Sequence, residues 1–125
     1  MTAIKSLKNK GQVDYDYKYD ILFFKAAERD YVKSIELDNL VLDIDKEGFI
    51  VGIQILEASK FLCLDKKILL KIPAWMFETK VDHGKIEVRL LFKMVLRNKI
   101  VEKNPIIMQE TTEPLPNSEL ICEVR

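Results

Sequence analysis

The sequence predicts a β-rich α+β domain, an antiparallel meander of about seven strands that carries one short helix. First, hydrophobic residues recur mostly at every second position, which places side chains on alternate faces of a strand. Second, short polar connections containing Gly, Asp or Asn separate these segments, as they do in hairpins. Third, only one segment shows the three- and four-residue spacing of an amphipathic helix. We expect a single domain over residues 1–109.

Composition and charge narrow the class of protein. The 125 residues include 20 Lys and Arg, 20 Asp and Glu, four Gly and four Pro, which is typical of one ordinary globular domain. Zero net charge disfavours partners such as duplex DNA or an anionic membrane, which a positive field attracts. No apolar run approaches the ~20 residues that span a bilayer, and lysines interrupt any signal-peptide core. We expect a cytoplasmic protein with no cofactor and no membrane association.

In the first half of the chain, the period-two pattern predicts strands at 13–16, 20–25, 31–37, 40–45 and 49–55. Gly48 supplies the positive φ that a short hairpin connection needs. The helix is expected over Glu57–Leu64, because Ala58, Phe61 and Leu62 form one apolar stripe.

The clearest strand of the second half is Lys85–Arg97, whose inward face would carry Ile86, Val88, Leu90, Phe92, Met94 and Leu96. Its length exceeds the usual five or six residues, so it should bend or pass from one partner strand to another. Further strands are expected at 68–72, 75–81 and 100–108, with turns at 82–84 and 97–99. Residues 110–125, rich in Thr and Pro, are expected to form a loose tail that could end in a short strand at 120–124.

An acidic turn is the most suggestive local motif. Asp43, Asp45 and Glu47 match positions 1, 3 and 5 of a calcium-binding loop, and Gly48 matches position 6. Position 12 is Gln54, which offers one carbonyl oxygen, and the flanks alternate as strands rather than helices. We interpret the motif as the tip of a β-hairpin. A small enzyme or cation-binding protein that uses Asp43, Asp45 and Glu47 remains the alternative.

One face of the long strand is a candidate interface. Basic side chains there alternate with two apolar ones, so that the predicted interface residues are Arg89, Leu91, Lys93, Val95 and Arg97. The simplest interpretation is a solvated sheet face. A protein interface, including a homodimer, is the alternative, and Leu91 and Val95 favour it because neither gains by facing water; nucleic acid is disfavoured because stacking aromatics are absent from this face. The bases could also meet the acids of residues 43–47 in a self-complementary dimer.

No catalytic residue stands out. His83 lies in a predicted turn and should be exposed, whereas Cys63 and Cys122 are expected to be buried, reduced thiols. Gly52 and Ser59 are given packing or backbone roles.

The segments Tyr15-Asp16, Asp20-Ile21-Leu22-Phe23-Phe24 and DIDKEGFIVGIQILEAS (43–59) resemble a small prokaryotic family, domain of unknown function 2283, over about residues 13–60. The chain departs from the family pattern at Gln54, where members usually have Glu. The resemblance implies a small β-rich domain with no established catalytic residues. Some relatives are suspected antitoxin-like partners of small toxins. We therefore expect a non-enzymatic interaction module that self-associates, with an antitoxin-like, partner-masking protein as an alternative.

Overall fold

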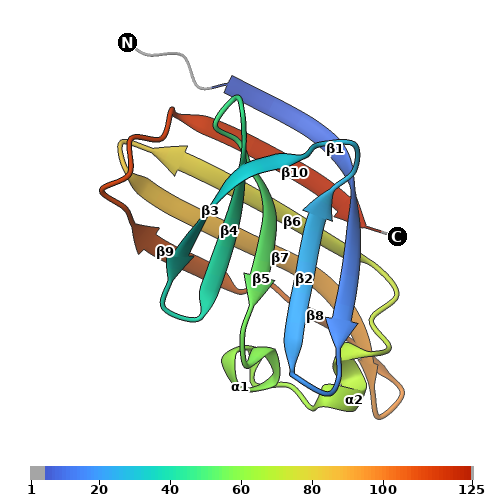
Figure 1. The fold of residues 1–125 in the computed structure, drawn as a ribbon. Helices are drawn as coiled ribbons and strands as arrows, with labels where there is room; N and C mark the ends of the chain where they lie inside the picture. Colours follow the sequence, from blue (N-terminus) through green and yellow to red (C-terminus); the bar gives the residue numbers. More distant parts are fainter. Residues whose placement is uncertain (1–4, 125) are drawn as a thin grey trace.

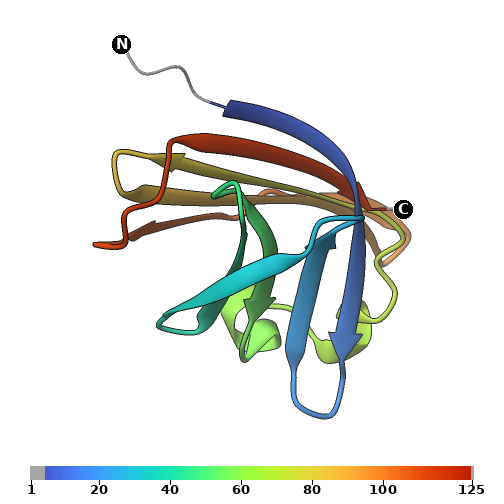
Figure 2. The same cartoon turned by 45° about the horizontal axis from the view of Figure 1, so that its top comes forward.

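The computed structural model describes residues 5–124 as two β-sheet layers that pack against each other, with two short helices at one end (Figures 1 and 2). The elements in chain order are β1 (Lys5–Asp16), β2 (Ile21–Ala26), β3 (Tyr31–Leu37), β4 (Leu40–Asp45), β5 (Ile50–Ile55), α1 (Ala58–Leu62), α2 (Lys66–Leu69), β6 (Trp75–Asp82), β7 (Lys85–Leu96), β8 (Lys99–Lys103), β9 (Ile106–Glu110) and β10 (Ser118–Val124). The strand order is β3-β4-β5-β2-β1-β10-β6-β7-β8, and β9 also pairs with β7.

Strand β1 belongs to both layers. Residues Lys5–Lys10 pair in parallel with β10, whereas Gly11–Asp16 pair antiparallel with β2. Figure 2 shows the strand curving from one layer into the other. A Cβ atom on Gly11 would lie only 2.7 Å from the Cγ2 atom of Val124, so the crossing point requires a residue without a side chain.

The β-rich class is confirmed, but the expected architecture differs in three details. The described residues form ten strands rather than about seven, the sheet is mixed rather than purely antiparallel, and there are two helices rather than one. The parallel pair joins the first and last strands, and hydrophobic periodicity cannot show which strands become neighbours. The strand expected at 68–72 is wrong. Helix α2 lies there instead, and the Asp65 carboxylate caps it by accepting a hydrogen bond from the Lys67 N–H at 2.9 Å.

The chain ends in a strand, which was one of the two possibilities expected for residues 120–124. Strand β10 lies between β1 and β6 in the interior of the sheet, and Leu120, Cys122 and Val124 are buried. Residues 111–117 have no regular structure.

The long strand β7 passes from one partner strand to another, as its length suggested. Lys85–Arg89 pair with β9, and Phe92–Leu96 pair with β8. The expected single strand over 100–108 is therefore two strands. The break falls at Pro105, which has no N–H to donate to the ladder.

Aromatic side chains join the two layers. The ring of Phe24, on β2, lies 5.1 Å from that of Trp75 and 5.2 Å from that of Phe77, both on β6, and Trp75 in turn contacts Phe92 at 4.2 Å. All four are buried, and burying a side chain of this size stabilises the fold by roughly 1.5–3 kcal/mol. No helix within residues 5–124 is long and apolar enough to cross a bilayer.

Candidate interaction surface

The outward face of β7 carries the residues that the sequence singled out. Lys93 and Val95 are exposed, Val95 by 69%, and Leu91 is half-buried. Arg89 is exposed on the same face, whereas Arg97 lies just beyond the strand, in the turn to β8 with φ of 50°. The inward residues of β7 are buried from Ile86 to Met94, so the predicted alternation is confirmed.

Three neighbouring side chains belong to this face and were missed. Ile100 on β8 is paired with Val95 and is 76% exposed, while Ile106 and Met108 on β9 are 48% and 58% exposed. The signal was present in the sequence, because Val101 and Ile107 alternate with these residues and point inward. We call Leu91, Val95, Ile100, Ile106 and Met108 the β7–β9 patch.

The bases on this face do not form an uninterrupted positive stripe. Each lies directly opposite an acid on a neighbouring strand. These pairs are Lys85 with Asp82 and Glu110, Arg89 with Glu78, and Lys93 with Glu102. Cross-strand charges of opposite sign offset each other, so the face is close to neutral. A phosphate backbone would gain little here, which agrees with the expectation from net charge.

Acids gather instead on β6 and β10. Burial raises the pKa of Glu78, and the neighbouring Glu119 carboxyl raises it further, although Arg89 acts in the opposite sense. Like charges that lie together favour the protonated form of one of them. The outer face therefore runs from acidic at β10 to mixed and apolar at β9.

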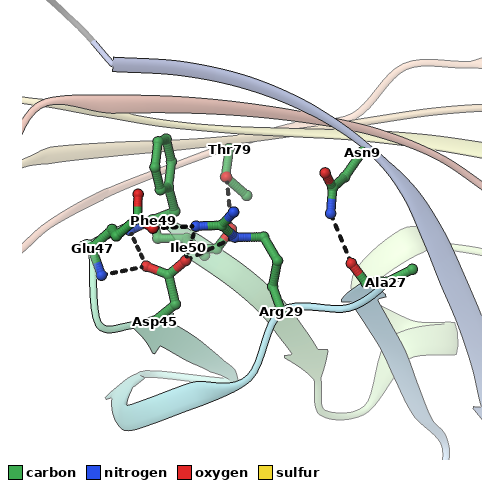
Figure 3. Close-up of polar contacts among 8 residues, drawn as sticks. All are labelled: Asn9, Ala27, Arg29, Asp45, Glu47, Phe49, Ile50 and Thr79. Atoms are coloured by element: carbon green, nitrogen blue, oxygen red, sulfur yellow. Dashed lines mark hydrogen bonds and ion pairs between the residues drawn. The ribbon is translucent and has the colours of Figure 1, made fainter.

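The acidic turn is built around an ion pair (Figure 3). The Arg29 guanidinium donates to the Asp45 Oδ2 atom from Nη2 at 2.5 Å and from Nε at 2.9 Å. The Oδ1 atom accepts hydrogen bonds from the backbone N–H groups of Glu47 and Phe49, both at 2.9 Å. The Asp45 side chain is only 4% exposed. Its carboxylate is therefore occupied in fixing the β4–β5 turn, and Gly48 takes the expected positive φ of 92°.

The other acids of the turn point elsewhere. The Asp43 Oδ1 atom accepts a hydrogen bond from the Ser34 hydroxyl at 2.6 Å, and its Oδ2 atom lies over Gly52. Glu47 is exposed and lies 3.5 Å from Arg29. Among residues 5–124, no group of three His, Cys, Asp or Glu side chains is arranged to hold a metal ion.

A second buried acid anchors helix α1. The Asp20 carboxylate accepts hydrogen bonds from the Ser59 N–H at 3.0 Å, the Ser59 hydroxyl at 2.6 Å and the Tyr15 hydroxyl at 2.6 Å. Burial raises the pKa of Asp20, but these bonds and the nearby Lys66 charge outweigh burial and lower it. The pKa of Tyr15 is raised by burial and by the same carboxylate. The structural role expected for Ser59 is thus confirmed, and it consists of joining α1 to the β1–β2 connection.

The histidine and cysteines are dispersed. His83 is exposed in its turn, as expected, with Nδ1 2.6 Å from the Asp82 carboxylate. Cys122 is buried, and burial raises the pKa of its thiol to about 12. Cys63 is exposed at the end of α1, so its expected burial is wrong. The helix ends there, with Cys63 at a positive φ of 56°.

Comparison with known proteins places this structure among its relatives. The family model "Protein of unknown function (DUF2283)" matches residues 12–59, which include Tyr15, Asp20, Asp43, Asp45 and Ser59. A Methanosarcina mazei protein named "Putative hypoxanthine phosphoribosyltransferase" is 38% identical over 92 residues, covering 72% of this chain and 73% of its own. No solved structure matches the chain.

A second relative extends the similarity beyond the segment that the family model matches. An uncharacterized protein of Methanocaldococcus jannaschii is 32% identical over 114 residues, covering 90% of this chain and 97% of its own. This chain and the Methanocaldococcus jannaschii protein therefore correspond over nearly their whole lengths. Over residues 12–59 the protein belongs to the DUF2283 family of proteins of unknown function, and over nearly its whole length it belongs to one family with the Methanocaldococcus jannaschii protein.

Proposed function

We propose that the protein is a non-enzymatic interaction module that self-associates through the β7–β9 patch. The observation that carries this proposal is the group of apolar side chains on one sheet face, with Val95 and Ile100 exposed by 69% and 76%. Exposed apolar side chains that gather on one face and are interspersed with charges are typical of protein interfaces. Strands β8 and β9 pair only with β7 within residues 5–124, so this face also ends at an open sheet edge.

A second copy is the partner that this face suits. Acids and bases alternate across it in directly opposed pairs such as Lys93 with Glu102. In a twofold-symmetric interface each surface meets its own copy, so a face that carries both charges and apolar side chains can complement itself. A dimer in which the acids of residues 43–47 contact the basic face of β7 is less favourable, because Arg29 already neutralises Asp45.

The name of the Methanosarcina mazei relative suggests a phosphoribosyl transfer, an activity that the residues of this chain do not favour. Phosphate groups commonly bind at glycine-rich loops that open a helix. The glycines of this chain stand alone, and Gly11 and Gly52 are required by close packing. Asp45 and Asp20 are likewise engaged in holding turns and helix α1.

The test measures mass in solution by size-exclusion chromatography with light scattering over a range of concentrations. We expect the wild-type chain to have twice the 14.6 kDa mass of one chain. The double variant Ile106→Lys/Met108→Lys should be monomeric, because charges replace the apolar contacts that β9 contributes to the patch. Val32→Lys is the matched control, since Val32 is 66% exposed on the other edge strand, β3.

Two outcomes would contradict self-association through this patch. One is a wild-type chain that stays monomeric at every concentration, which would favour the antitoxin-like alternative with a different partner. The other is a dimer that survives the double variant or is broken equally by Val32→Lys, which would place the interface elsewhere.

A further inference from the structure

A groove lies between the α2 segment, by which we mean helix α2 and the residues that follow it as far as Pro73, and the β7–β8 hairpin. Its volume is about 500 Å³, and it is lined by Lys67, Ile68, Lys71, Pro73, Lys93, Met94, Val95 and Ile100. This size falls in the range of roughly 300–1,000 Å³ that is typical of small-molecule sites. The groove could not be predicted from the sequence, because the pattern of residues 68–72 predicts a strand there.

The lining is apolar except for positively charged side chains. Five of the eight residues are apolar, and the other three are lysines; the lining contains no acid. Met94 is buried, whereas Lys67, Lys71 and Lys93 are exposed. An apolar ligand body can therefore cover the side chains of residues such as Ile68 and Met94, while an anionic group meets the ammonium groups.

We infer that this groove binds a small anionic amphiphile: a free molecule with an alkyl or similar apolar body and one carboxylate or phosphate group. The apolar lining favours the body through burial of nonpolar surface. Lys67 and Lys71 select for negative charge, because no carboxylate of the lining competes for them, whereas Lys93 lies opposite Glu102. A neutral molecule of the same shape would bind more weakly, and a cationic one would be repelled.

This inference does not depend on self-association, although Val95 and Ile100 line the groove and also belong to the β7–β9 patch. Lys67, Ile68 and Lys71 come from the α2 segment and belong to the groove alone. Ile106 and Met108 pair with the other half of β7 and belong to the patch alone. Substitutions can therefore separate the two surfaces.

The experiment titrates decanoate into the full chain and follows methyl groups by NMR. We expect chemical-shift changes at Ile68, Met94 and Ile100. The variant Lys67→Gln/Lys71→Gln should bind decanoate about five- to tenfold more weakly, the size expected for two exposed charge pairs. Lys46→Gln/Lys60→Gln is the matched control, since these exposed lysines lie outside the groove, and its affinity should equal that of the wild type.

Two further ligands test the chemistry. Decanol has the same chain without the charge and should bind more weakly than decanoate by a similar factor. Equal binding of decanol, an unchanged affinity of the Lys67/Lys71 variant, or shifts confined to Ile106 and Met108 would overturn the inference. Sedimentation with phosphatidylglycerol vesicles, without binding of free decanoate, would also overturn it, because the recognised anion would then be a membrane surface.

Repeating the titration in the Ile106→Lys/Met108→Lys variant separates this inference from the proposed function. Binding at wild-type affinity in a monomeric variant would support the groove whatever the fate of the dimer. Binding lost in that variant, but present in the wild type, would show that the ligand site needs the assembly and would overturn a site built by one chain.

Discussion

The acids of residues 43–47 illustrate how single side chains can suggest a binding site and yet serve the fold. Asp45 is held by Arg29 and by two backbone N–H groups, while Asp43 is held by Ser34. A cation would have to compete with a guanidinium for the most buried of these carboxylates. The positions of the hydrogen-bond donors, rather than the number of acidic residues, therefore decide whether these carboxylates can bind a cation.

Substitution of Gly52 tests whether the Asp43 carboxylate is held over this residue. A Cβ atom at this position would lie 2.8 Å from the Asp43 Oδ2 atom, so Gly52→Ala should destabilise the fold by about 1–3 kcal/mol through overpacking. Asp43→Ala removes the obstructing carboxylate, and the double variant should recover most of the loss made by Gly52→Ala. Urea unfolding of the four proteins measures the coupling. Strictly additive effects would show that Asp43 does not restrict residue 52.

At the scale of elements, the short helix α1 depends on a distant acid. A helix of five residues is marginal by itself, and no side chain of its own N-cap residue, Glu57, bonds to its first turn. Asp20 supplies that function, because its carboxylate and its backbone carbonyl accept the N–H groups of Ser59 and Ala58. Asp20 takes a positive φ of 57° to do so. The helix is thus fixed by the β1–β2 connection rather than by its own sequence.

Stability should therefore fall in acid through Asp20. The folded state lowers the pKa of this carboxyl, so its contribution is present above the unfolded pKa, near 4, and is lost as pH falls through the folded value. At pH 7, Asp20→Asn should cost about 2 kcal/mol, typical of hydrogen bonds to a charged group. The difference from wild type should shrink below about pH 4. Denaturant unfolding between pH 7 and pH 2 measures it, with Asp30→Asn as the control for lost surface charge. A difference that is independent of pH would contradict the proposed role.

At the scale of the whole molecule, the two ends of the chain hold the layers together. Strand β1 begins beside β10 and ends beside β2, and β10 lies between β1 and β6. The alternate side chains of β10 consequently face different surroundings. Leu120 is fully buried between the layers, while Ile121 is half-buried on the outer face.

That arrangement predicts unequal effects of two neighbouring substitutions. Leu120→Ala should destabilise the protein by about 2–5 kcal/mol, the usual range for a buried leucine. Ile121→Ala, on the same strand with its side chain outside the core, should cost clearly less. Thermal or urea unfolding compares them. Equal, small losses would instead support the loose tail that the composition of residues 110–118 suggested.

The sequence predicts local structure correctly where hydrophobic and polar residues alternate regularly, or where a turn requires a glycine. The alternation in Lys85–Arg97 identified β7 and both of its faces, and Gly48 marked the β4–β5 turn, because strand faces and positive φ impose strong local rules. Residues 12–59 also carried enough of the family pattern to be assigned from sequence. The candidate site was predicted only in part: the β7 residues were found, but their apolar neighbours on β8 and β9 were not.

Tertiary structure decided everything that depends on which segments meet. Periodicity reports the faces of a strand and not its neighbours, so the parallel pairing of β1 with β10 and the acids opposite Arg89 and Lys93 could not be foreseen. The same limit concealed Arg29 as the partner of Asp45, sixteen positions away. By itself, the sequence determined a neutral, β-rich chain with marked turns and one conspicuous strand. Folding decided that Asp20, Asp43 and Asp45 hold turns and helix α1 and that a few apolar side chains, such as Val95 and Ile100, stay exposed on one face, because contacts between distant residues fix where charge is neutralised.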